Sequence, residues 1–174
     1  MATTYLSRTV TEDATNTKAT ISTWFKRSAL SGTEHHLYAI QDGVHEVRLG
    51  FDNNDCMFFY YYPAGTGYNR TTNRVFRDFG AWYHVVVQYD STQVTANDRI
   101  KIYVNGVQET SFSLLNNPGS SANSFIFQDA TGYLGCSELA AGIFDGYMAH
   151  YHISQGYAYD ASTFGEFDST SGIW

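Results

Sequence analysis

Short runs of alternating apolar and polar residues recur along the chain and predict β-strands. In one run, apolar or aromatic residues occupy every second position: Tyr83, Val85, Val87 and Tyr89. A period of two places consecutive side chains on opposite faces of a sheet, so these four are expected to face a core together. The same alternation, or an apolar run bounded by turn residues, predicts further strands at Ile21–Phe25, Val47–Phe51, Phe125–Phe127, Tyr133–Gly135 and Tyr147–Ser154.

Two segments carry stronger local signals. Met57–Tyr62 is apolar or aromatic at every position, which predicts a strand that is covered on both faces. Ile100–Val104 is followed by Asn105 and Gly106, a residue pair that favours the two positive φ angles of a type I′ turn. We therefore expect a β-hairpin around this turn.

The segments between the predicted strands are polar or rich in glycine, and no internal repeat divides the chain. Short helical turns are expected at Ser137–Ala141 and Ala161–Phe167, and Asn116–Asn123 is expected to be a mobile loop. Many strands with hairpin turns favour an antiparallel architecture. We predict an all-β fold of two antiparallel sheets packed as a sandwich, with residues 1–174 forming one domain. Residues 1–18 would form an N-terminal strand and loop, and residues 160–174 a C-terminal extension.

The composition supports this interpretation and excludes several classes of protein. Hydrophobic residues make up 43% of the chain, aromatic residues 17% and charged residues only 16%. Aromatic and β-branched residues favour the pleated, half-buried surface of a sheet. The low charge argues against disorder, and the lack of sustained helical periodicity excludes coiled coils and helical bundles.

The net charge of −7 counts against a nucleic-acid partner, because phosphate-binding surfaces need clustered Lys and Arg. The densest basic stretch contains Arg70, Arg74 and Arg77, but Asp78 follows at once, which favours a solvated loop. No apolar run reaches the roughly 20 residues of a membrane span, so membrane insertion is not expected. Met1–Arg8 lacks the apolar core of a secretion signal, so Sec-type secretion is not expected either.

Two isolated cysteines, Cys56 and Cys136, form neither a disulfide framework nor a zinc motif. We expect two small buried thiols in a chain that folds in a reducing cytoplasm, while a single bridge between them stays open.

The order of the motifs resembles that of the laminin-G-like, concanavalin A-like family. The segments that carry the resemblance are Thr20–Arg27, Ala81–Asp90, Ile100–Gln108, Tyr133–Gly135 and Phe144–Ala149. They come in the family order and cover nearly the whole chain. The resemblance implies a jelly-roll sandwich. The chain departs from the family at His150 and His152, where members often carry Asp or Glu.

The two ends of the chain carry a narrower resemblance. Tyr5–Thr9 and Ser162–Trp174 resemble laminin-G-like domains in structural proteins of tailed marine bacteriophages. In that group the domain typically lies on the virion surface, in capsid decoration proteins, tail fibres or other appendages. The resemblance therefore implies a virion role for a protein that is assembled in the host cytoplasm.

Concanavalin A-like folds also include glycosidases, which need two carboxylates about 5–10 Å apart across the scissile bond. The family's Glu-x-Asp-x-x-Glu run is absent, and the six glutamates are scattered along the chain: Glu12, Glu34, Glu46, Glu109, Glu138 and Glu166. No Gly-x-Ser-x-Gly elbow is present either. We therefore expect no catalytic residues and no enzymatic activity.

Two sets of residues are weighed as metal ligands. His150 and His152 would share a strand face and could hold a metal with His84, but ordinary polar or interface positions explain them as well. Asp52–Asp55 is the best candidate for a structural calcium, because hard cations take several oxygen ligands in a turn. A bare Asx-rich turn explains this segment equally, so no metal or other cofactor is assigned.

Tyrosines dominate the candidate contact surfaces. Tyr61, Tyr62 and Tyr68, with Arg70 nearby, are candidates for an aromatic surface that contacts a glycan or another subunit. Outward strand positions such as Tyr60, Tyr62 and Tyr103 are also aromatic, which favours a homo-oligomer or contacts with other virion proteins. A trimer is the commonest arrangement for such appendages, although the sequence does not fix the number of subunits.

Two functions follow from these observations. The main expectation is a non-enzymatic structural protein on the surface of a bacteriophage virion, mounted on the capsid or the tail. The alternative is a carbohydrate-binding adhesin module that recognises polysaccharide on the host surface.

Overall fold

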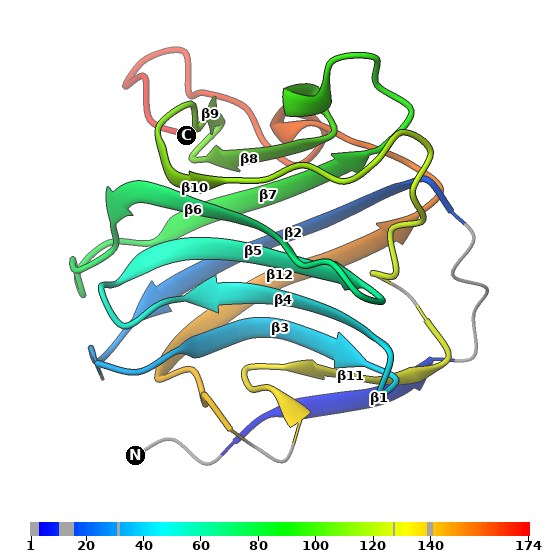
Figure 1. Cartoon of the computed structure of the whole chain (residues 1–174). Helices are drawn as coiled ribbons and strands as arrows, with labels where there is room; N and C mark the ends of the chain where they lie inside the picture. Colours follow the sequence, from blue (N-terminus) through cyan, green and yellow to red (C-terminus); the bar gives the residue numbers. More distant parts are fainter. Residues whose placement is uncertain (1–3, 11–15, 31, 127, 139–140) are drawn as a thin grey trace.

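The computed structural model describes residues 4–10, 16–30, 32–126, 128–138 and 141–174. The strands are β1 (Leu6–Val10), β2 (Lys18–Arg27), β3 (His35–Gln41), β4 (His45–Phe51), β5 (Cys56–Pro63), β6 (Tyr68–Val75), β7 (Tyr83–Asp90), β8 (Ile100–Val104), β9 (Val107–Gln108), β10 (Phe112–Leu115), β11 (Ala130–Leu134) and β12 (Gly146–Gln155). They form a seven-stranded sheet A, in the order β1-β11-β3-β4-β5-β6-β10, and a five-stranded sheet B, in the order β12-β2-β7-β8-β9. The two sheets lie face to face (Figure 1), so the predicted antiparallel sandwich is confirmed.

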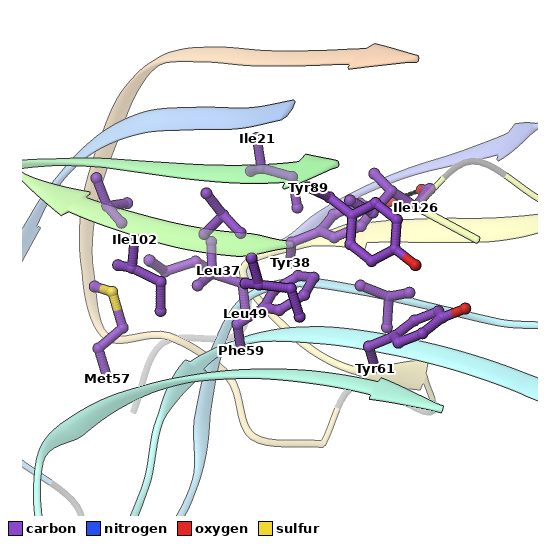
Figure 2. Packing of buried hydrophobic residues seen from close by; sticks show 14 of the residues in the cluster. Ile21, Leu37, Tyr38, Leu49, Met57, Phe59, Tyr61, Tyr89, Ile102 and Ile126 are labelled. Carbon is purple, nitrogen blue, oxygen red and sulfur yellow. Dashed lines mark hydrogen bonds between the residues drawn. The ribbon is translucent and has the colours of Figure 1, made fainter. Parts of the chain in front are cut away.

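The core lies between the two sheets and follows the alternation in the sequence. On β7, Val85, Val87 and Tyr89 point inward and are fully buried. Figure 2 shows Leu49 and Phe59 of sheet A packed in the same cluster. Burial of a side chain of this size stabilises the fold by roughly 1.5–3 kcal/mol. The inward positions of β4, β5, β7 and β8 thus account for most of the core.

The predicted hairpin is confirmed. β8 and β9 pair around Asn105 and Gly106, whose φ angles are 48° and 76°. Two positive φ angles match the right-handed twist of the flanking strands. One of the two predicted helical turns is also present, as a short 3-10 helix at Ala161–Thr163. Asn116–Asn123 contains no strand or helix, and its mobility stays a prediction.

Several elements differ from the prediction. β3, β6 and β10 were not expected, and the solvated loop predicted around the three arginines is wrong because Arg70 and Arg74 lie on β6. The strand predicted at Phe125–Phe127 is also wrong: Phe125 has a φ of 49° and Ile126 is irregular, while residue 127 lies outside the described residues. The turn predicted at 137–141 includes residues 139–140, which likewise lie outside them.

The segment after β12 turns back across sheet B and ends beside β8 and β9 (Figure 1, orange to red). It holds the 3-10 helix η3 (Ala161–Thr163); another 3-10 helix, η1, lies at Ala96–Asp98. Within the described ranges, no helix has the length and apolarity that crossing a bilayer requires. Both cysteines are free thiols, Cys136 buried and Cys56 partly exposed.

Candidate functional site

The outer face of sheet B is covered by the segment that follows β12. Gln88 Nε2 donates a hydrogen bond to the carbonyl oxygen of Ala158 at 2.8 Å. Val86 points outward on β7, yet 0% of its surface is exposed. Trp174 stacks on His84 with ring centroids 5.7 Å apart. The segment therefore forms a third layer that hides much of this face.

His84 lies beneath this layer with both ring nitrogens engaged. Trp174 Nε1 donates to Nδ1 of His84 at 2.9 Å, and Nε2 lies 2.9 Å from Ser22 Oγ. An indole N–H can only donate, so Nδ1 accepts and the proton on Nε2 is donated to the serine. Burial, together with nearby His152, lowers the pKa of His84 to about 4. The ring is therefore neutral at pH 7.

The histidines proposed as metal ligands line one cavity of about 380 Å³ on this face, but they do not form a ligand set. His150 and Tyr151 together oppose Thr23 in a β-bulge, and His150 has a φ of 50°. The nitrogens of His84 are already used. In the part of the chain that the structure describes, no group of three or more His, Cys, Asp or Glu residues is placed to hold a metal ion.

The turn at residues 52–55 is held by its own hydrogen bonds and by ion pairs to two arginines. Asp52 Oδ1 accepts a hydrogen bond from the backbone N–H of Asn54 at 2.9 Å, which is an Asx turn. Asp55 Oδ1 lies 3.0 Å from Arg27 Nη1, and Asp55 Oδ2 accepts from Arg77 Nε at 2.8 Å. The Asp55 carboxylate is therefore neutralised by two arginines, and the turn does not present a free set of calcium ligands.

The four residues predicted to form one contact surface do not share a face. Tyr61 is fully buried in the core (Figure 2), and the ring of Tyr68 stacks on it at 5.9 Å. Arg70 is only 3% exposed and donates from Nη2 to the carbonyl oxygen of Asn97 at 2.8 Å. Tyr62 lies on the opposite, outer face of sheet A, because neighbouring residues on a strand point to opposite sides.

The outer face of sheet A carries a different pair of tyrosines. Tyr60 and Tyr62 alternate with buried Tyr61 on β5, and their rings lie nearly parallel with centroids 6.4 Å apart. The two rings are half-buried. We expected both faces of β5 to be covered, but on the outer face only Phe58, which is 4% exposed, is buried. The guanidinium carbon of Arg48, opposite Tyr60 on β4, lies 4.8 Å from the Tyr60 ring centroid.

Two glutamates hold Arg48 in place. Arg48 Nε lies 2.8 Å from Glu46 Oε1, and Nη1 donates to Glu34 Oε2 at 3.1 Å. Burial raises the pKa of Glu46; Arg48 opposes this shift, and Glu138 and Glu34 add to it. Three carboxyl groups far apart in the sequence are thus close enough to interact on this face.

These residues border a shallow pocket of about 270 Å³ on the outer face of sheet A. We call it the sheet A pocket; its lining residues are Glu34, Arg48, Asp52, Phe58, Tyr60, Asn69 and Thr71. Tyr60 closes one side and lies against the backbone at Gly67, where a Cβ would come within 2.9 Å of the tyrosine oxygen. An aromatic face beside hydroxyl, amide and charged groups can bind a polar molecule that also has an apolar face, such as a sugar ring.

Sequence reasoning missed most of this pocket. The period of two already places Tyr60 on the outer face beside Tyr62, so the strand pattern contained that part of the answer. Glu34, Arg48 and Asn69 come from three other segments, and only the pairing of β3, β4, β5 and β6 brings them together. No spacing along the chain signals this arrangement.

The comparisons with known proteins place these features in context. The family model described as the Concanavalin A-like lectin/glucanases superfamily matches residues 2–160. A search of curated protein sequences finds none that matches the chain. Several solved structures have a similar fold, but each shares less than a quarter of its residues with this chain, so they show the fold alone.

Three of these structures illustrate the range. The carbohydrate-binding module CBM40 of the Ruminococcus gnavus IT-sialidase has a TM-score of 0.66 and 13% identity, over 86% of this chain and 82% of that one. Domain 4 of a GH43 extracellular arabinanase from Geobacillus stearothermophilus, solved with arabinotriose, has a TM-score of 0.60 and 22% identity, over 83% and 64%. Domains LG4-5 of the mouse laminin alpha1 chain have a TM-score of 0.62 and 11% identity, over 87% and 40%.

Proposed function

Because the chain belongs to the Concanavalin A-like lectin/glucanases superfamily, we propose that it is a carbohydrate-binding module that binds glycans without hydrolysing them. The observation that carries the proposal is the sheet A pocket, where Tyr60 lies beside Tyr62 and a polar wall around Arg48. Sugar rings have one apolar face that stacks on an aromatic ring and hydroxyl groups that need hydrogen-bond partners.

Two further observations support this location. The chain's own C-terminal segment covers much of the outer face of sheet B, whereas the outer face of sheet A keeps half-buried tyrosines open to solvent. In addition, two of the similar structures contain sugars: the arabinanase domain was solved with arabinotriose, and the sialidase module has also been solved bound to α2,3 sialyllactose.

Binding without catalysis agrees with the state of the carboxylates. A glycosidase needs one carboxylic acid that can protonate the leaving oxygen and one free carboxylate opposite it. Glu34 and Glu46 both form ion pairs with the same Arg48, so both carboxylates are already engaged with that guanidinium. We therefore propose that the pair orients Arg48 and takes no part in bond cleavage.

The main expectation from the sequence, a structural protein on a virion surface, gains no support from the comparisons, which favour the carbohydrate-binding alternative. The virion role rests on the resemblance of the two chain ends and stays a prediction. If it holds, the glycan would be a polysaccharide of the host surface and the module would act as an adhesin.

A glycan array followed by titration calorimetry tests the proposal. Wild-type protein should bind at least one oligosaccharide, and Tyr60→Ala should weaken that binding at least about fivefold, which corresponds to a lost stacking contact of about 1 kcal/mol. Tyr60→Phe keeps the ring and should retain most of the affinity. Tyr157→Ala removes a tyrosine that is more exposed, at 61%, from the other side of the molecule and should change nothing. A flat array, or equal loss in the Tyr60→Ala and Tyr157→Ala variants, would contradict the proposal.

A further inference from the structure

The sheet A pocket holds more negative than positive charge. Glu34 and Asp52 line it, Glu46 borders it, and Arg48 is the single cation among its described lining residues. With three carboxylates against one guanidinium, these four groups carry a net charge of −2. His36, which lies 3.8 Å from Glu34, adds no positive charge at pH 7 because burial lowers its pKa to about 4.

Arg48 is already paired with two carboxylates of the protein itself. A guanidinium recognises a carboxylate with two parallel N–H groups, and it is selective when that fork is open. Here Nη1 donates to Glu34 at 3.1 Å, and Glu46 Oε1 lies 2.8 Å from Nε at ion-pair distance but without a hydrogen bond to it, while the flat side of the group covers Tyr60. A sugar carboxylate that approaches this guanidinium would also come close to both glutamates.

Building on the proposed function, we infer that the sheet A pocket selects glycans without acidic groups. Neutral and amino sugars fit its charge, whereas sialic acids, uronic acids and sulfated sugars are repelled. This differs from the similar sialidase module, which has been solved bound to a sialylated sugar. The preference for neutral over acidic glycans rests on the pairing of Glu34 and Glu46 with Arg48, because the fold alone allows binding of either class.

The direct test compares matched glycans on one array, in which the same oligosaccharide appears unmodified, with an amino sugar, and with a sialyl, uronyl or sulfate group. Neutral and amino forms should bind, and the acidic form of a bound oligosaccharide should bind at least about threefold more weakly at low salt. The difference should shrink in 0.5 M salt, because exposed charges farther apart than the Debye length (~4 Å at that concentration) are largely screened.

Each outcome is decisive. If the protein binds acidic glycans as well as or better than their neutral counterparts, the selectivity is refuted while the binding function stands. If nothing on the array binds, the proposed function itself fails. These two failures are distinguishable because only the first leaves a bound ligand.

A charge-removing variant gives an independent test. Glu34→Gln frees one side of Arg48 and removes a negative charge from a residue whose side chain is 51% exposed, so the fold is expected to survive. Affinity for α2,3 sialyllactose should rise at least about threefold relative to lactose. Glu166→Gln changes the net charge equally on the exposed C-terminal segment and should leave this ratio unchanged. An equal ratio in wild type and Glu34→Gln would contradict the inference.

Discussion

Replacement of Asp55 by Asn should destabilise the protein strongly, because it leaves a buried arginine without its counterion. Arg27 ends β2 in sheet B with 1% of its side chain exposed, and its Nη1 lies 3.0 Å from Asp55 Oδ1, in the turn before β5 of sheet A. The same nitrogen also donates to the carbonyl oxygen of Phe76 at 2.8 Å. The ion pair therefore joins the two sheets at one edge of the core.

The choice of Asn isolates the charge. Asp55 has a φ of 64°, and Asn tolerates this left-handed conformation as well as Asp does. Removal of one partner from a buried ion pair typically costs about 3–5 kcal/mol. Arg77, the second partner of Asp55, is 56% exposed and can turn to solvent, so its loss adds little.

Urea unfolding followed by tyrosine and tryptophan fluorescence measures this cost. We expect Asp55→Asn to lower the free energy of unfolding by about 3 kcal/mol or more, and the melting temperature by about 10 °C. In an Arg27→Met background the same substitution should cost less than about 1 kcal/mol, since no buried charge is left behind. A cost below about 1 kcal/mol in the wild-type background would refute the reasoning. If millimolar calcium raises the free energy of unfolding of the wild type, the turn at residues 52–55 binds calcium after all.

Three further predictions follow from other parts of the structure. Gly67→Ala should push the Tyr60 ring out of place, weakening glycan binding severalfold while costing less than about 1 kcal/mol of stability, as calorimetry and urea unfolding can check. Burial lowers the pKa of His84 to about 4, below the unfolded value of 6.5, so the unfolded chain binds the extra proton first. This group alone should lower the stability by about 2 kcal/mol between pH 7 and 5; His36, whose pKa burial also lowers to about 4, adds to the fall, and urea unfolding of His84→Gln should show the loss of the His84 contribution only. The oligomer predicted from the sequence should show a mass above 19.5 kDa in light scattering, and Tyr147→Ser should reduce it, since Tyr147 is 62% exposed beside Trp82 on sheet B; a wild-type monomer would contradict it.

The strands that the sequence predicts are those whose inward positions are apolar. β7 and the hairpin after β8 follow directly from Val85, Val87 and the Asn105–Gly106 pair. β6 was missed because it places Arg70 on the inward face, where an apolar residue is expected. Arg70 is tolerated there because Asn97, in the short 3-10 helix, and Asn117, in the loop after β10, supply oxygen acceptors for its guanidinium. Contacts of this kind are set by tertiary structure and leave no periodic signal.

In the candidate site, too, the alternation along one strand could be predicted, whereas contacts between distant segments could not. Alternation along β5 predicts that Tyr60 and Tyr62 share the outer face and excludes Tyr61 from it. The ion pair between Arg48 and Glu34 could not be predicted in the same way. Glu34 precedes β3, and it reaches Arg48 only because β3 pairs with β4. That Trp174 would fold back onto His84, close the other face and use both histidine nitrogens could not be foreseen, because the two residues are 90 positions apart.

A two-dimensional amide NMR titration, with an oligosaccharide that the array selects, shows directly whether glycans bind on the outer face of sheet A. We expect shift changes to centre on β4, β5 and β6, at Arg48, Tyr60 and Asn69, and to disappear in Tyr60→Ala. Shift changes centred on the C-terminal segment over sheet B, with these three residues unaffected, would contradict it.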